Sequence, residues 1–441
     1  MVGAVPAVHA AATRLTTTEA RRARRTARDS TRRGPARHTA KLPMQWVSEI
    51  SVAPSFVDAL AEAAAGVSAR LGGSAPTVVF AFASPHHREH FEALPSAVAD
   101  TLGTNLVFGC GAAGIIGGAR EVERNPAFAL VGAVMPAVEL RTFHIDTAML
   151  PASDAAALEW HERLGVAPDD AETMIVLADP HTSHVIPLLA GLDRAYPNTV
   201  KVGGLISGSA PPVGAALFAG RRTHPSGVVG LAIAGNVVVD TIVAQGCRPI
   251  GTPMFITRAD ANLAHELDGR NAARVLQETY EHATPRDREL MRSALFLGLA
   301  GAPDREVYGQ GDFLVRNVLG LDAKSGALAV GANLRTGGVV QFHVRDAETS
   351  ATDLENHLAR YRERGVRPAG ALMFSCVGRG VGLYGHPNHD TDELIDSVGR
   401  SPGELAVAGF FGNGEIGPVG RQTHLHGYTS VIALFRRAHS D

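Results

Sequence analysis

The amino-acid sequence predicts an α/β protein of two related halves, in which repeated strand–helix–strand units and added antiparallel hairpins form mixed sheets flanked by helices. Three observations predict this fold class. A pattern of apolar run, Pro-His turn, helix, second apolar run and two glycines occurs twice, a looser third copy follows, and short turns join further apolar runs. A crossover of this length normally makes a right-handed parallel pair, so each copy should contribute two parallel strands.

The two clear copies have matching chemistry at both ends. The first runs from a strand at 77–83 through Ser84-Pro85-His86 to Gly109 and Gly114, and the second from 174–178 through Asp179-Pro180-His181 to Gly203 and Gly208. Ser and Asp, here Ser84 and Asp179, are preferred at the N-cap position. A proline at the first helical position is tolerated because the N–H that it lacks would have no hydrogen-bond partner within the helix. We therefore expect a helix directly after each first strand. The Pro-His turns and the glycine loops should lie at the carboxyl ends of strands, where open α/β sheets collect ligands.

The remaining elements follow from periodicity and turn residues. Ser55 and Asp58 have capping-box spacing, which predicts a helix over 56–71. In the first half we expect strands at 128–134, 138–144, 228–233 and 237–242, the last two joined as a hairpin by Ala234-Gly235-Asn236. In the second half we expect strands at 253–258, 262–267, 294–299, 328–332 and 339–344, helices at 271–282 and 350–364, and a hairpin turn at 335–338. The third copy has strands at 371–374 and 405–408, a helix at 390–398, and Gly409 and Gly414.

Charge is unevenly distributed along the chain. The 441 residues are 45% hydrophobic and 19% charged, as in ordinary globular domains, and the formal net charge is −3. Residues 1–43 carry +8, which leaves −11 for residues 44–441. An acidic folded part disfavours nucleic-acid binding, and no apolar stretch reaches the ~18–20 residues of a membrane span. We therefore expect neither nucleic acid nor a membrane as a partner.

Residues 1–43 form a basic leader without an apolar segment, which argues against a secretory or twin-arginine signal. Its composition suits a transit peptide or a nucleic-acid-binding tail. The interpretation we favour is a disordered extension, or a start assigned too early with Met44 as the true first residue.

Three cysteines, Cys110, Cys247 and Cys376, lie far apart and have no CxxC spacing. Neither a disulfide framework nor a zinc site is predicted from them. We expect a soluble cytoplasmic protein with no cofactor and no metal.

Several motifs resemble the FIST family, named for F-box and intracellular signal transduction proteins. The N-terminal module of that family is similar to this chain at Asp179-Pro180, at residues 191–197 and at residues 202–208. The C-terminal module is similar at residues 247–251, 266–270, 374–380, 414–418 and 425–427. The resemblance extends over residues 75–435, and Gly246-Cys247-Arg248-Pro249 is the expected boundary between module 44–246 and module 247–441.

The resemblance implies an intracellular sensory protein whose paired modules bind small ligands, with amino acids among the suggestions. No F-box, kinase, cyclase or methyl-accepting segment is visible in the sequence. The output is therefore expected to pass through a downstream signalling partner, which the sequence does not identify.

The candidate site consists of glycines and polar residues near predicted strand ends. The N–H groups of Gly-rich turns can converge on an anion, although such glycines can equally serve only tight turns. Arg379, in a loop with Gly378, could hold a carboxylate with its planar guanidinium, while Glu415 could receive a ligand amine. If both shared one pocket, they would match the two ends of a zwitterion. The candidate ligand-binding residues are Arg379, Glu415, Cys376, Ser375, Gly378, Asn413, Gly203, Gly204, Gly109, Gly111 and His181.

Two other classes of function remain open. Cys376, His426 and Glu415 supply the residue types of a thiol hydrolase or acyltransferase, with a glycine loop as oxyanion hole. Cysteine is also common as a small buried hydrophobic residue. The third class is an interaction scaffold that offers sheet edges to a partner and binds no small molecule.

Overall fold

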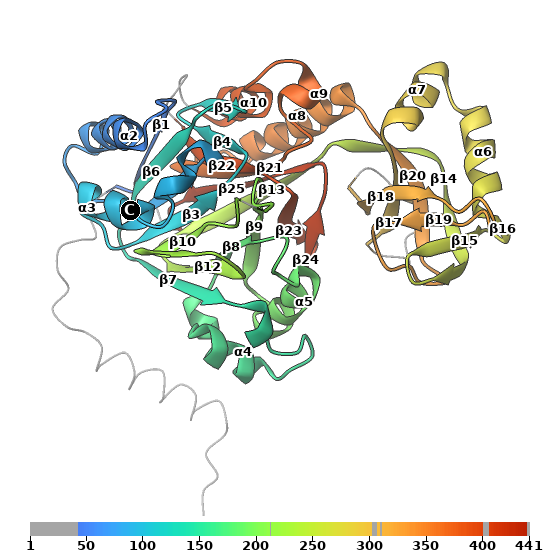
Figure 1. The fold of residues 1–441 in the computed structure, drawn as a ribbon, viewed down its shortest axis with the longest axis horizontal. Coiled ribbons are helices and arrows are strands. Elements are labelled where there is room, and N and C mark those ends of the chain that lie inside the picture. Colours follow the sequence, from blue (N-terminus) through green and yellow to red (C-terminus); the bar gives the residue numbers. More distant parts are fainter. Residues whose placement is uncertain (1–42, 212, 302–306, 309–310, 400–404, 439–441) are drawn as a thin grey trace, which may run out of the picture. The chain divides into compact units, whose positions relative to one another are not determined.

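The computed structural model describes residues 43–211, 213–301, 307–308, 311–399 and 405–438 (Figure 1). These residues form an α/β protein with mixed sheets flanked by helices, as the sequence predicts. The predicted leader lies outside the described residues, apart from Pro43. Within the described residues, none of the helices has the length and apolar character needed to cross a membrane.

Three six-stranded sheets in the described part of the chain share one strand order, with a parallel pair at the centre. The first sheet has the order β1 (Gln45–Ser51), β6 (Phe128–Val134), β2 (Val78–Ala83), β3 (Val107–Gly111), β10 (Leu217–Gly220), β11 (Arg222–His224). The second has β7 (Val138–Ile145), β12 (Val228–Gly235), β8 (Thr173–Ala178), β9 (Val200–Leu205), β23 (Gly414–Val419), β24 (Gln422–His426). The third has β13 (Val238–Gln245), β25 (Thr429–Arg436), β21 (Gly370–Cys376), β22 (Ala406–Gly412), β4 (Gly114–Gly117), β5 (Arg120–Glu123). The looser third copy of the sequence pattern is thus a full structural copy.

The outer hairpin of each sheet comes from a different copy of the unit. The first unit runs from β1 to β6, and its hairpin β4–β5 pairs with β22 of the third sheet. The second unit runs from β7 to β12, and its hairpin β10–β11 pairs with β3 of the first sheet. The third unit runs from β13 to β25, and its hairpin β23–β24 pairs with β9 of the second sheet. The exchange closes a cycle, so every sheet requires two units.

One apolar core joins the inner faces of the three sheets, while helices cover the outer faces (Figure 1). The helices are α2 (Phe56–Arg70) and α3 (Leu94–Leu102) on the first sheet, α4 (Ala157–Leu164) and α5 (Val185–Ala195) on the second, and α8 (Ala347–Glu363) and α10 (His389–Val398) on the third. Shorter helical turns are η2 (Pro85–His90), η3 (Thr147–Met149), η4 (Pro168–Asp170) and α9 (Val381–Tyr384). Strands covered on both faces appear in the sequence as continuous apolar runs, which is why the central strands are predictable.

Three equivalent glycines allow the parallel strands to approach. Gly109, Gly203 and Gly409 lie opposite a residue of the neighbouring parallel strand, and a Cβ on any of them would stand 1.8–1.9 Å from that residue's carbonyl oxygen. Their φ angles, +147° to +158°, are ones that side chains with a Cβ rarely adopt. The expectation that these glycines form loops is wrong, because they lie inside strands.

Residues 247–345, which we call the insert, leave the third unit between β13 and α8. The insert holds a sheet of order β14 (Cys247–Asp260), β20 (Val339–Arg345), β17 (Leu295–Ala300), β18 (Phe313–Leu321), β19 (Leu328–Val330), β15 (Leu263–Leu267), β16 (Arg270–Asn271), with helices α6 (Ala272–His282) and α7 (Pro285–Ser293). Cys247 and Arg345 are paired in register, so the insert departs and returns at adjacent points. The module boundary at residue 246 stays a prediction, although β13, before it, pairs with β25, far beyond it.

Two predicted hairpins are wrong for a common reason. The hairpin predicted between strands 228–233 and 237–242 does not form, because β12 is already paired with β7 on one edge and β8 on the other. β13 pairs with β25 instead. Likewise β20 is flanked by β14 and β17, and β19 pairs with β15 and β18. Partners that are distant in the sequence occupy the edges that the local turn signals assigned to neighbours.

Helix starts were predicted with mixed success. Ser55 caps α2 and accepts the N–H of Asp58, as expected. Ser84 precedes η2, but its hydroxyl accepts the N–H of Ala127. The helix expected after Asp179 begins only at Val185, because the Asp179 carboxylate holds the intervening residues in a turn through Thr182. The helix expected at 350–364 begins earlier, at Ala347, with Asp346 as its N-cap.

Candidate functional site

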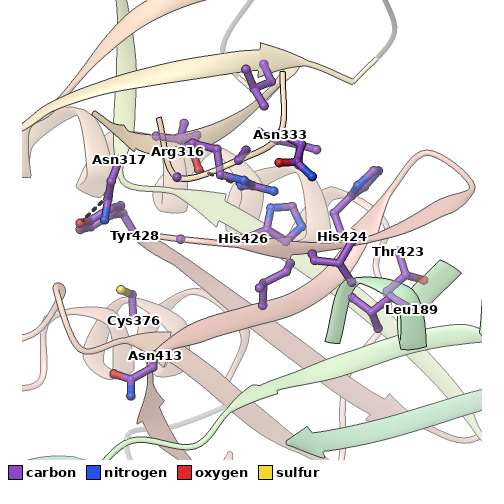
Figure 2. A pocket seen from close by; sticks show the side chains of 18 of the residues that line it. Leu189, Arg316, Asn317, Asn333, Cys376, Asn413, Thr423, His424, His426 and Tyr428 are labelled. Carbon is purple, nitrogen blue, oxygen red and sulfur yellow. Dashed lines mark hydrogen bonds between the residues drawn. The ribbon is translucent and has the colours of Figure 1, made fainter. Parts of the chain in front are cut away.

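A cavity of about 1180 Å³ lies where α5, β24 and the turn after β21 face β17 and β18 of the insert (Figure 2). The predicted residues Cys376, Gly378, Asn413 and His426 line it. Figure 2 shows Arg316 and Asn333 on the insert side, Cys376 and Asn413 on the opposite side, and His426 between them. The cavity therefore has walls from both the insert and the three-sheet body.

Cys376 is the last residue of β21 and is 7% exposed. Cys376 comes three residues after Met373, the strand partner of Gly409, just as Ser84 comes three residues after Ala81, the strand partner of Gly109. In the third copy Cys376 therefore occupies the place that Ser84 holds in the first. The N–H of Gly378 donates to its sulfur at 3.4 Å. Burial, and then the neighbouring Glu415, raise the pKa of the Cys376 thiol to about 12. The group is a neutral thiol at physiological pH.

Glu415 is fully buried in β23, paired in register with Gly204 on one side and His426 on the other. Its Oε2 accepts the N–H of Thr429 at 3.2 Å, and its Oε1 has no hydrogen-bond partner among the described residues. Burial raises its pKa well above the usual range, which favours a protonated carboxyl group. Glu415 contacts the Cys376 thiol but is not part of the cavity lining.

Arg379 is also fully buried, which excludes a surface role for it. Its Nε and Nη2 donate to the two carboxylate oxygens of Asp390 at 2.7 and 2.9 Å, and Nη2 also donates to the Tyr384 hydroxyl at 2.6 Å. Its Nη1 has no partner among the described residues. Burial alone would raise the pKa of Asp390, but the charge of Arg379 outweighs it and holds that pKa below the usual range. The guanidinium is thus largely committed to a carboxylate of its own chain.

Ser375 belongs to the same buried network. Its hydroxyl donates to Asp390 at 3.3 Å, and its side chain is excluded from solvent. Ser375, Arg379 and Glu415 therefore lie behind the cavity wall rather than in it.

The other predicted residues are elsewhere. Gly109 and Gly111 are in β3 of the first sheet, and the N–H of Gly111 is used by the carbonyl of Ala216. Gly203 and Gly204 are in β9. His181 is exposed in the turn after β8. None of these five lines the cavity within the described residues.

The histidines on the cavity wall are neutral. His426 Nε2 donates to the carbonyl oxygen of Gly417 at 3.2 Å. Burial lowers the pKa of His426 to about 4, and it also lowers the pKa of His424. Neither imidazole carries a charge at neutral pH.

Sequence reasoning missed the insert's contribution to the site. Arg316 and Asn317 are in β18, Asn333 follows β19, and Tyr428 precedes β25 and donates its hydroxyl to Asn317 at 3.0 Å. No strand was expected over 313–321. The apolar run Phe313-Leu314-Val315, followed after two polar residues by Val318-Leu319, is the signal that could have found β18.

Comparison with known proteins adds family membership to this geometry. An uncharacterized protein of Mycobacterium tuberculosis is 36% identical over 387 residues, which cover 88% of this chain and 98% of the relative. An uncharacterized protein of Mycobacterium bovis is 34% identical over 387 residues, which cover 88% of this chain and 97% of the relative. A solved structure of cyanuric acid hydrolase, described as evolutionary innovation by structural concatenation, covers 90% of this chain and 100% of its own, at 12% identity and a TM-score of 0.30. That structural likeness is too low to carry an argument.

Two family models match most of the chain. The FIST N domain matches residues 77–270, and the FIST C domain matches residues 272–418. The two matches are consecutive and follow the order expected from the motifs. The chain belongs to the FIST family.

Proposed function

We propose that this chain is a small-molecule sensing module whose ligand binds in the 1180 Å³ cavity and whose conformation a signalling partner reads. FIST domains are associated with sensing in signal transduction. The observation that carries the proposal is the cavity itself. It is large enough for a small metabolite, and its lining is mostly apolar with a few polar groups, as in ligand-binding pockets.

The placement of the cavity supports coupling between binding and output. Its walls come from α5 of the second unit, from the third unit and from the insert. A ligand that contacts the insert and the body at the same time stabilises the conformers in which the two cavity walls are close enough for both contacts. The partner would then distinguish liganded from unliganded protein through the population of those conformers.

Amino acids are the ligand class that the family resemblance suggests, and they are part of this proposal. Arg379 and Glu415 do not line the cavity, so their part in binding would be indirect. The three cysteines are free thiols, which supports a reducing compartment such as the cytoplasm.

A thiol hydrolase or acyltransferase is the second candidate, because Cys376 lines the cavity and contacts Glu415. Its thiol pKa of about 12 gives almost no thiolate, and His426 Nε2 is bound to Gly417. Iodoacetamide labelling at pH 7 separates the two. A sensor should show Cys376 labelling no faster than a free thiol, whereas labelling many times faster would favour the enzyme.

A thermal-shift screen of the full chain against the amino acids and other small metabolites tests the sensing proposal. A ligand at 100 times its Kd should add ~2.7 kcal/mol to the unfolding free energy. Gly427 lines the cavity and has no atom within 4 Å of where a Cβ would stand, so Gly427→Phe should obstruct part of the cavity and reduce the shift. Gly382 has similar open space outside the cavity lining, so Gly382→Phe is the matched control. Absence of any shift would favour the interaction scaffold, whereas an equal shift in Gly427→Phe would show that the ligand binds outside this cavity.

A further inference from the structure

The charges of the cavity do not balance. Among the described lining residues, Arg316 is the only arginine or lysine, and Asp193 is the only acid. Asp193 is already engaged, since Lys201 donates to it at 2.9 Å and Thr423 donates to both of its oxygens at 2.7 Å. The positive charge of Arg316 therefore has no counter-charge in the cavity wall.

Arg316 lies in β18 and is half-buried, and burial lowers its pKa. Its Nη1 donates to the carbonyl oxygen of Val315 at 2.8 Å, and no carboxylate of the described residues forms an ion pair with it. Figure 2 shows the guanidinium among the cavity residues, near His424 and His426. These imidazoles are neutral, so they neither repel nor neutralise it.

A charge partly withdrawn from water without a counterion is unfavourable, and a ligand that brings an opposite charge relieves this cost. A guanidinium holds a carboxylate through two parallel hydrogen bonds. One unbalanced positive charge matches one carboxylate better than a phosphate dianion. Asn317, whose carbonyl oxygen accepts from Tyr428, and Asn333 offer amide groups on the same side of the cavity.

We propose that the ligand is a small organic acid whose carboxylate pairs with Arg316 and whose hydrocarbon part lies against the leucines of the cavity wall, Leu189, Leu299, Leu314 and Leu425. This inference rests on the proposed function, because it assigns the ligand class of the same cavity. It uses Arg316, which the sequence motifs did not single out.

The test uses the full chain and three probes of equal chain length, hexanoate, hexanamide and hexanol, with inorganic phosphate as a fourth, all at matched ionic strength in sodium chloride. Binding is followed by thermal shift and by isothermal titration calorimetry. The variant is Arg316→Gln, which removes the charge and keeps a polar side chain of similar reach. The matched control is Arg335→Gln, an exposed insert arginine outside the cavity lining.

We expect hexanoate to bind wild type and Arg335→Gln at least tenfold more tightly than hexanamide or hexanol, and we expect Arg316→Gln to lose this preference. Without probe, Arg316→Gln should unfold at the same temperature as wild type or higher, because the variant no longer partly buries an unpaired charge. A structural role of Arg316 would instead lower the unfolding temperature of the variant. Calorimetry thus separates a lost ligand contact from a lost fold.

Three outcomes would overturn the inference. Equal binding of hexanamide and hexanoate would show that the cavity takes small molecules without using Arg316, which leaves the proposed function standing. Phosphate binding that is lost in Arg316→Gln, with no hexanoate binding, would replace the carboxylate by a phosphate. Failure of every probe here, together with failure of the metabolite screen, would remove the proposed function as well.

Discussion

Glu121 is the residue through which the exchanged hairpin β4–β5 holds the start of α10. Its carboxylate accepts the N–H of Asn388 at 3.0 Å and both the N–H and the hydroxyl of Thr391, at 3.0 and 2.9 Å. The side chain is 5% exposed. Burial, and then the charge of Asp390, raise its pKa to about 7 in spite of these bonds.

This elevated pKa predicts a pH-dependent contribution to stability. Because the folded-state pKa of about 7 lies above the ordinary glutamate value of 4.5, the contribution is complete below pH 4.5 and is lost as pH rises through 7. Between pH 4.5 and pH 7.5 the unfolding free energy of wild type should fall relative to that of Glu121→Gln by about 3 kcal/mol. Urea denaturation at several pH values measures this difference. Parallel profiles for the two proteins would contradict the assignment.

The pair Arg379 and Asp390 gives a second prediction at this scale. Arg379→Met should lower the unfolding free energy by about 3–5 kcal/mol, because it leaves the buried Asp390 charge without a partner. The double variant Arg379→Met/Asp390→Leu should recover most of that loss. Chemical denaturation of the three proteins provides the comparison. A double variant that is less stable than Arg379→Met would show that the network is needed as a whole.

These residues also show what the sequence could and could not reveal. Arg379 was recognisable as a cation in a glycine-rich loop, but nothing local indicated that Asp390, eleven positions later, takes up its guanidinium. The sequence offered Cys376 and His426 only as residue types, and the structure brings both to the cavity wall from two different sheets, at the ends of β21 and β24. Arg316 was not recognisable as a site residue, because it lies in β18 of the insert, far in the sequence from the motifs that indicated the site.

At the scale of elements, the repeated glycines are the clearest link between sequence and fold. Their constant spacing revealed the repeat, and the structure supplies the physical cause, a Cβ clash with the carbonyl of the parallel neighbour. The exchange of hairpins was not predictable. Local turn residues indicate that a hairpin forms, but the edge that it joins depends on strands hundreds of residues away.

Substitution of these glycines tests this account. Gly409→Ala would place a methyl group 1.8 Å from the carbonyl oxygen of Met373, so β21 and β22 could not keep their pairing. We expect a loss of more than 4 kcal/mol in unfolding free energy or an insoluble protein. Gly382→Ala, which meets no atom within 4 Å, should change stability by less than about 1 kcal/mol. Similar midpoints in urea for both variants would contradict the proposed role.

At the scale of the whole molecule, the residues that the structure describes between 43 and 438 form one cyclically exchanged body and one insert. The insert departs and returns at paired residues, Cys247 and Arg345, and has its own apolar core. The body, in contrast, cannot be cut between units without breaking a sheet, because each of its three sheets contains strands from two units.

We therefore expect the body to fold without the insert, and we expect the N-terminal part of the body not to fold without the rest. Replacement of residues 248–344 by Asn-Gly, a two-residue hairpin turn, should leave a soluble body that unfolds cooperatively. The fragment 43–246 should not unfold cooperatively by itself, because β4 and β13 lack their partners β22 and β25 in the third sheet. Circular dichroism melts of the two proteins provide the comparison. A cooperative transition for the fragment would support the boundary at residue 246 as a true domain boundary.

The cyclic exchange also constrains how the chain folds during translation. Ile116 in β4 pairs with Gly409 in β22, so the first hairpin waits for roughly 290 further residues before its partner exists. At 5–20 residues per second this interval is roughly 15–60 s. Throughout it the nascent polypeptide exposes an unpaired strand edge outside the ribosome, where chaperones and other nascent chains compete for it. Successful biosynthesis of this protein should accordingly depend on elongation rate and on chaperone supply more than that of a chain whose units fold one after another.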